Sequence, residues 1–268
     1  MSRAAVLYAA AFGDDPGHWP LPAPTTSYEM WLRAVAAGGQ GRYGAAAADL
    51  SALRRAERTG PLASLAHSTQ GSFLRQLGGH AVARRWDGRA AMLAGHHAGA
   101  RAQPDAALDA LLGLAADALG LRRFAASAAL LSRAQALLGA DGVTDRQPLR
   151  WHWVAAELAM VRGSGAEAVT HAEIAVGLAA SHPSARHRVK TAVVHAAALC
   201  SAGALDEARS VADCALSASA RWGLTPLRWA DACLLADIGS SNLDGPDVRA
   251  VRDACADAIC RSGGQWLG

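Results

Sequence analysis

Small apolar residues recur at helical spacing in the last third of the chain. After Gly203, alanines stand at Ala208, Ala212 and Ala215, four and three residues apart. These spacings place the alanines on one face of a helix, where a neighbouring helix can approach closely. An alanine-rich stretch ends near Ser201 just before the glycine, which allows the backbone to reverse its direction. The pattern predicts an antiparallel helix pair.

Similar pairs follow one another along the chain, because turn glycines recur with separations of 38, 41, 43, 40 and 42 residues. A small residue stands five positions after five of these six glycines and seven positions before five of them. Small side chains at both places indicate two helices that cross closely. The six glycines are Gly41, Gly79, Gly120, Gly163, Gly203 and Gly245.

Prolines occur in phase with these glycines, and each stands near the predicted start of a unit's first helix. Proline is tolerated in the first turn of a helix and disfavoured in its middle. The sequence therefore predicts about six antiparallel helix pairs over residues 27–262, preceded by an arm or linker (1–26) and followed by a tail (263–268). The prolines are Pro61, Pro104, Pro148, Pro183 and Pro226.

Composition supports an all-α class, since half of the residues are hydrophobic while aromatic residues make up only 5%. Alanine accounts for much of the difference, and it is the best helix former. All basic residues except Lys190 are arginines, a bias typical of a GC-rich genome such as that of an actinobacterium. The net charge of +3 does not require a nucleic acid as partner. Five cysteines without C-x-x-C spacing, and no apolar run long enough to cross a bilayer, predict a cytoplasmic protein.

Two hexapeptides connect the pattern to a known family. Gly41-Arg42-Tyr43-Gly44-Ala45-Ala46 and Gly203-Ala204-Leu205-Asp206-Glu207-Ala208 each place a large residue two positions, and a small one five positions, after the turn glycine. This arrangement resembles the tetratricopeptide repeat (TPR), and the resemblance extends over residues 27–262. It implies a right-handed superhelical array, or α-solenoid, although the period is longer than the family's usual 34 residues.

The resemblance also implies a concave groove lined by the first helix of each pair. Groove residues of this family stand 13, 10, 6 and 3 positions before the turn. Aromatic and arginine side chains often carry binding energy, so we expect a protein or peptide segment, acidic or amphipathic, to bind there. Trp31 and Trp153 could instead fill gaps in the core, and Asp117 is expected at a solvated helix end. The expected partner-binding residues are Tyr28, Trp31, Phe73, Arg150, Trp153, Glu157 and Lys190.

Other functions remain open. The arm or the tail could occupy the groove, in the same chain or in a second copy, and the protein would then be a structural homodimer. A third alternative is a regulatory domain that responds to a small ligand or a nucleic acid. The sequence contains no recognised catalytic, phosphate-binding or zinc-binding motif. We therefore expect a non-catalytic interaction module, an adaptor or regulatory scaffold, without a cofactor or metal.

Overall fold

The computed structural model describes residues 2–95 and 104–267, which contain thirteen α-helices and no strand. This confirms the predicted all-α class. The helices are α1 (Arg3–Phe12), α2 (Ser27–Gly39), α3 (Tyr43–Ala56), α4 (Gly60–Gln76), α5 (His80–Gly95), α6 (Pro104–Gly120), α7 (Phe124–Gln135), α8 (Arg146–Val161), α9 (Gly165–Ala180), α10 (Ala185–Ser201), α11 (Leu205–Arg221), α12 (Thr225–Ile238) and α13 (Gly245–Arg261).

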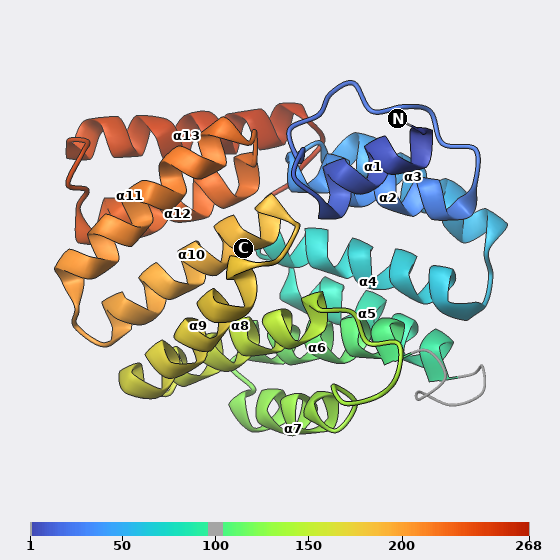
Figure 1. The fold of residues 1–268 in the computed structure, drawn as a ribbon, viewed down its shortest axis with the longest axis horizontal. Coiled ribbons are helices and arrows are strands. Elements are labelled where there is room, and N and C mark those ends of the chain that lie inside the picture. Colours follow the sequence, from blue (N-terminus) through green and yellow to red (C-terminus); the bar gives the residue numbers. More distant parts are fainter. Residues whose placement is uncertain (1, 96–103, 268) are drawn as a thin grey trace.

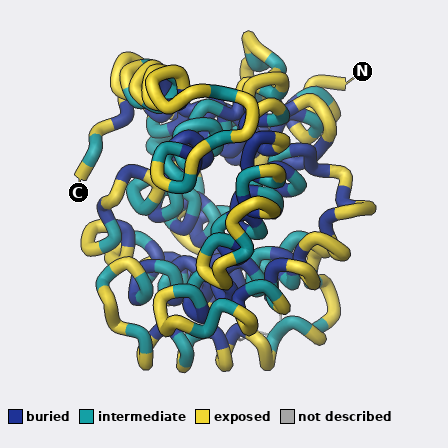
Figure 2. The backbone as a smooth tube through the Cα atoms, turned by 90° about the vertical axis from the view of Figure 1, so that its left-hand side faces the viewer, coloured by how far each residue is buried: buried dark blue, intermediate teal, exposed yellow. Residues whose placement is uncertain are grey.

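Helices α2 to α13 form six consecutive pairs, and every helix packs against the next one along the chain (Figure 1). The first helices of neighbouring pairs also touch, in the order α2, α4, α6, α8, α10 and α12. These six helices are therefore the inner layer of the array. Buried residues lie toward the inside of the molecule and exposed residues toward its outside (Figure 2). The predicted prolines lie at or near helix starts, as Pro61 and Pro226 do in the first turns of α4 and α12.

The turn within each of the first five pairs contains one residue with a positive φ. These residues are Gly41 (82°), Gly78 (86°), Arg122 (58°), Gly163 (76°) and Gly203 (84°). In each turn the following residue donates its N–H to a carbonyl five positions earlier, which satisfies a free group at the helix end. The predicted turn glycines were correct in three of these pairs and wrong in two, where Gly78 and Arg122 replace Gly79 and Gly120. In the sixth pair Gly245 begins α13, and Gly239 (85°) ends α12.

When positions are counted from the observed turn residues, both sets of small residues are more regular than when they are counted from the predicted glycines. Seven positions before the turn residues stand Ala34, Gly71, Ala115, Ala156, Ala196 and Ala232, and every one of them is buried. Five positions after the first five turns stand Ala46, Ala83, Ser127, Ala168 and Ala208, all fully buried. At Gly71, a Cβ atom would lie 2.7 Å from the Oδ2 atom of Asp87 on the partner helix. Close helix crossing thus explains the small side chains.

The first 26 residues pack against the array rather than extending away from it. Helix α1 contacts α2, and the ring of Phe12 lies 5.2 Å from that of Trp31. The segment after α1 is held by Gln40, whose Nε2 donates to the carbonyl groups of Pro16 (2.8 Å) and His18 (3.0 Å). The N-terminal segment therefore belongs to the same hydrophobic core as α2 and α3.

The two ends of the array also meet. The N–H of Gly44 donates to the carbonyl of Ser262 (2.8 Å), and the N–H of Leu267 donates to that of Leu77 (2.8 Å). Ile259 of α13 is buried in the core cluster built by α1 to α4, and Trp266 packs on the same cluster. The last helix pair and the tail thus close the array against its first pairs. The inner helices consequently surround a central space.

Candidate functional site: a central cavity

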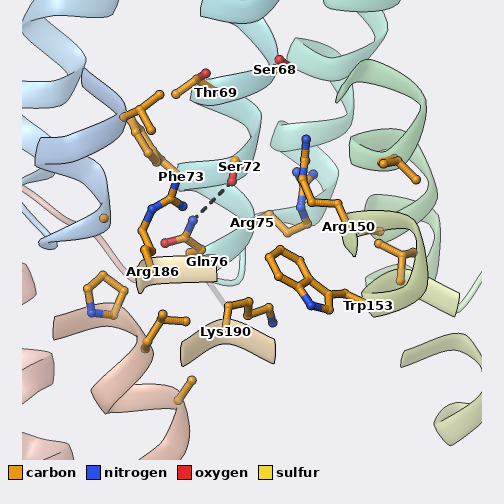
Figure 3. A pocket seen from close by; sticks show the side chains of 18 of the residues that line it. Ser68, Thr69, Ser72, Phe73, Arg75, Gln76, Arg150, Trp153, Arg186 and Lys190 are labelled. Atoms are coloured by element: carbon orange, nitrogen blue, oxygen red, sulfur yellow. Dashed lines mark hydrogen bonds between the residues drawn. The ribbon is translucent and has the colours of Figure 1, made fainter. Parts of the chain in front are cut away.

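A cavity of about 560 Å³ lies between the inner helices. Its lining comes mainly from α2, α4, α6, α8, α10 and α12, with contributions from α1, α3, α5, α13 and the C-terminal tail. Figure 3 shows labelled side chains from α4, α8 and α10 extending into this space. The aromatic part of the lining consists of Phe12, Trp31, Tyr43, Phe73, Trp153, Trp229 and Trp266.

The tryptophans on α2 and α8 are held in fixed orientations by equivalent hydrogen bonds. The Nε1 atom of Trp31 donates to the hydroxyl of Thr69 on the next inner helix (3.0 Å), and that of Trp153 donates to Thr191 (2.9 Å). Trp153 also stacks on His187, with ring centroids 5.5 Å apart. Only 6% of Trp31 and 9% of Trp153 are exposed. Both rings therefore form part of the wall and present a limited apolar surface to the cavity.

Basic side chains outnumber acidic ones in the lining. The basic residues are Arg75, Arg146, Arg150, Arg186 and Lys190, and the acidic residues are Asp109 and Glu157. Lys190 pairs with Glu157 across α10 and α8, with Nζ and Oε1 3.2 Å apart. Arg75 and Arg150 lie close together in Figure 3, whereas Arg186 extends from α10 beside Phe73 and Gln76. Aromatic and basic side chains thus lie together in the lining of one cavity.

Arg75 belongs to a buried network beneath the cavity wall. Its Nη1 atom donates to Asp87 (2.8 Å), to Asp117 (2.6 Å) and to the carbonyl of Gly113 (3.1 Å). Burial raises the pKa of Asp87 to about 7, although Arg75 opposes this shift. The prediction of a solvated Asp117 was wrong, since this carboxylate is fully buried. With the turn at Arg122, Asp117 lies on the face of α6 toward α4 and α5.

A second network holds the other arginines. Arg146 pairs with Asp105 (2.6 Å) and with Asp109 (2.7 Å), and Arg150 also pairs with Asp109. Burial, followed by repulsion from Arg75, lowers the pKa of Arg150 to about 10. Arg186 has no acidic partner among the described residues, and burial together with Arg150 and Arg146 lowers its pKa to about 10 as well. Both guanidinium groups remain charged at neutral pH.

Six of the seven predicted site residues line the cavity: Trp31, Phe73, Arg150, Trp153, Glu157 and Lys190. Tyr28 does not. It lies near the outer surface beside Tyr8 and Leu32, in a separate shallow hollow, and 44% of it is exposed. Three residues of α-helix leave Tyr28 rotated from Trp31 by about 60° around the helix axis, and Tyr28 lies beside Tyr8 of α1 instead of in the cavity.

The sequence analysis missed several lining residues for identifiable reasons. In the third pair, positions 13, 10, 6 and 3 before the true turn at Arg122 are Asp109, Leu112, Ala116 and Leu119, and all four line the cavity. Counting from Gly120 selected a different face of α6. Arg146 and Arg186 stand four residues, about one helical turn, before the first groove position of their helix pairs, so the family's groove positions did not include them. Phe12 comes from outside the repeats, where no repeat pattern applies. Trp266 belongs to the tail, which the sequence analysis gave as an alternative occupant of the groove.

No family model matches this chain, and no curated protein matches it either. Within the described residues, no group of three or more His, Cys, Asp or Glu side chains could hold a metal ion. None of the helices in this part of the chain is long and apolar enough to cross a membrane. The geometry of the cavity is therefore the basis for assigning a function.

Proposed function

We propose that this protein is a non-catalytic interaction module that binds a short acidic segment of a protein or peptide in its central cavity. The observation that carries the proposal is the combination of aromatic walls with five basic side chains in one cavity, where Arg186 has no acidic partner among the described residues. Apolar side chains of the segment would contact Trp31, Phe73 and Trp153. Its carboxylates would be attracted by the arginines and by Lys190.

We further propose that the array is a TPR-like α-solenoid. The recurring turn geometry and the two sets of buried small residues support this assignment. The contacts between the inner helices of successive pairs support it too, because such contacts define stacked repeats. The five cysteines are free, which is typical of a reducing compartment such as the cytoplasm.

The size of the cavity limits its occupant. Ligand sites for small molecules commonly have volumes of about 300–1,000 Å³, and this cavity falls within that range. A peptide would therefore place only a few residues inside. Enclosure by Phe12 and Trp266 also favours a second candidate, a small organic anion that is bound whole and regulates the protein.

The test is to screen a library of random heptapeptides against the wild type, Trp153→Ala and Trp19→Ala. Trp19 is 45% exposed, stacks under Arg42 and lies outside the cavity, so it is a matched control. We expect the wild type and Trp19→Ala to enrich acidic peptides with apolar side chains. Trp153→Ala should bind these peptides at least about 30-fold more weakly, as for a residue of central importance to binding.

Circular dichroism must show that each variant is folded, and Phe73→Leu serves as a second cavity variant. If both cavity variants bind the enriched peptides as tightly as the wild type does, the proposed site is disproved. Enrichment of no peptide by the wild type would disprove peptide binding and leave the small anion as the candidate.

Self-association through a docked arm or tail remains the alternative prediction. In this structure, Phe12 and Trp266 line the cavity of their own chain, so these segments reach it without a second copy. Light scattering measures the mass directly. A dimer that dissociates when residues 263–268 are deleted would favour the structural homodimer over the interaction module.

A further inference from the structure

Arg186 is a half-buried cation whose charge is not balanced within the described residues. It stands in the first turn of α10 and lines the cavity, and its Nε atom is buried without a hydrogen-bond partner among the described residues. Within this part of the chain, its one hydrogen bond runs from Nη2 to the carbonyl of Ala11 (3.2 Å). A buried guanidinium group without a counter-charge is costly unless another ion pairs with it.

The groups around Arg186 increase this imbalance. Arg150 and Arg146 are close enough to lower its pKa, and the nearby carboxylates, Asp105 and Asp109, already pair with these two arginines. Burial, followed by the charge of Arg186, also lowers the pKa of His187 well below its usual value, so this imidazole is neutral. The positive charge at this end of the cavity therefore belongs to the arginines and attracts an anion.

We propose that Arg186 forms an anion subsite that holds a carboxylate or phosphate group of the ligand. This inference rests on the proposed function of the cavity, and it places the anionic group of the ligand at Arg186. Guanidinium groups bind both anions through two parallel hydrogen bonds, which a lysine cannot reproduce. The side chains of Arg186 and Arg150 approach the cavity from α10 and α8 (Figure 3).

Aromatic rings next to the subsite define the rest of the ligand. The ring of Phe12 lies 5.9 Å from the guanidinium carbon of Arg186 and 5.5 Å from that of Arg146. Trp153 stands one helical turn from Arg150 on α8, with its ring stacked on His187. The subsite therefore favours an anionic group attached to a flat apolar body. In a peptide, this would be a terminal or acidic side-chain carboxylate next to an apolar residue.

The test uses phenyl phosphate, phenylacetate and inorganic phosphate as probes on the full chain, with sodium chloride at matched ionic strength as a reference. Affinity is measured by calorimetric titration and supported by the shift in melting temperature. The variants are Arg186→Gln, Arg186→Lys and, as a control on the same helix, Arg188→Gln. The guanidinium of Arg188 donates to the carbonyls of His182 and Pro183, and this residue does not line the cavity.

We expect at least one aromatic probe to bind the wild type and Arg188→Gln with similar affinity. Arg186→Gln should weaken this binding at least tenfold, and Arg186→Lys should restore only part of it. Without any anion, Arg186→Gln should melt at the same temperature as the wild type or higher, because an unbalanced charge has been removed. A purely structural role of Arg186 would instead lower the melting temperature and leave the affinity unchanged.

The comparison between probes identifies the anion, since stronger binding of phenyl phosphate than of phenylacetate indicates a phosphate site, and the reverse a carboxylate site. Binding of neither probe, or equal binding by Arg186→Gln, overturns the subsite. If the library peptides bind Arg186→Gln unchanged but not Trp153→Ala, the subsite fails while the proposed function stands. If a probe binds through Arg186 and no peptide is enriched, the subsite stands and peptide binding fails.

Discussion

The carboxyl group of Asp231 lies inside the last helix pair, where neither of its oxygens has a hydrogen-bond partner. The residue is fully buried on α12. Burial, with a smaller contribution from the negative charge of Asp213, raises the pKa of Asp231 to about 8. This carboxyl group is therefore protonated in the folded protein at neutral pH and ionised in the unfolded chain. Its effect on stability follows from this difference.

Asp231 should make the protein less stable as the pH rises from about 4 to about 8. Over this range the folded state keeps a proton that the unfolded state has lost, and each pH unit then costs up to about 1.4 kcal/mol. Asp231→Asn should remove this part of the slope, while Asp257→Asn, at an exposed position on α13, should not. Urea unfolding at several pH values measures the slope, and an unchanged slope in Asp231→Asn would contradict the assignment.

At the scale of the helices, the turns determine which face of each inner helix reaches the cavity. Glycine adopts a positive φ without strain, so Gly41, Gly163 and Gly203 could be located from the sequence. Arg122 adopts the same conformation against its intrinsic preference, so the sequence did not reveal the turn at this residue. The resulting error of two residues moved Asp117 from a buried ion pair to an apparent surface position.

Replacing Arg122 by glycine should therefore stabilise the protein by about 1 kcal/mol, because it removes the strain of a side chain at a positive φ. Arg123→Gly should not stabilise it, since Arg123 has a φ of −94°. Thermal unfolding of both variants makes the comparison. Destabilisation by Arg122→Gly would mean that interactions of the arginine side chain outweigh the strain.

At the scale of the whole molecule, closure of the array converts a groove into a cavity. Contacts between the first and last pairs depend on the tail, where Trp266 lies 4.4 Å from the ring of Trp229 and packs on the core of α1 to α4. The same tail supplies part of the cavity lining. Closure and ligand binding are therefore expected to be coupled.

Trp266→Ala should destabilise the protein by about 2 kcal/mol through lost apolar burial. It should also make the cavity more accessible, so that ligand association and dissociation both become faster. Leu267→Ala is a suitable control, because Leu267 is 47% exposed and its hydrogen bond to Leu77 uses the backbone. Stopped-flow tryptophan fluorescence measures the rates, and unchanged rates in Trp266→Ala would show that the tail does not control access.

The amino-acid sequence by itself determined the helical class, the six pairs, and three of the seven aromatic and two of the five basic residues that line the cavity. These features depend on local preferences: alanine at helical spacing, glycine in turns and proline in first turns. The tertiary structure alone decided that the two ends meet, that Phe12 enters the lining, and that Arg186 lacks an acidic partner among the described residues. It also placed Trp266 of the tail in the lining, which the sequence had left as one alternative. Such features depend on contacts between residues far apart in the sequence, such as Ala11 with Arg186 and Gly44 with Ser262. No local pattern encodes those contacts.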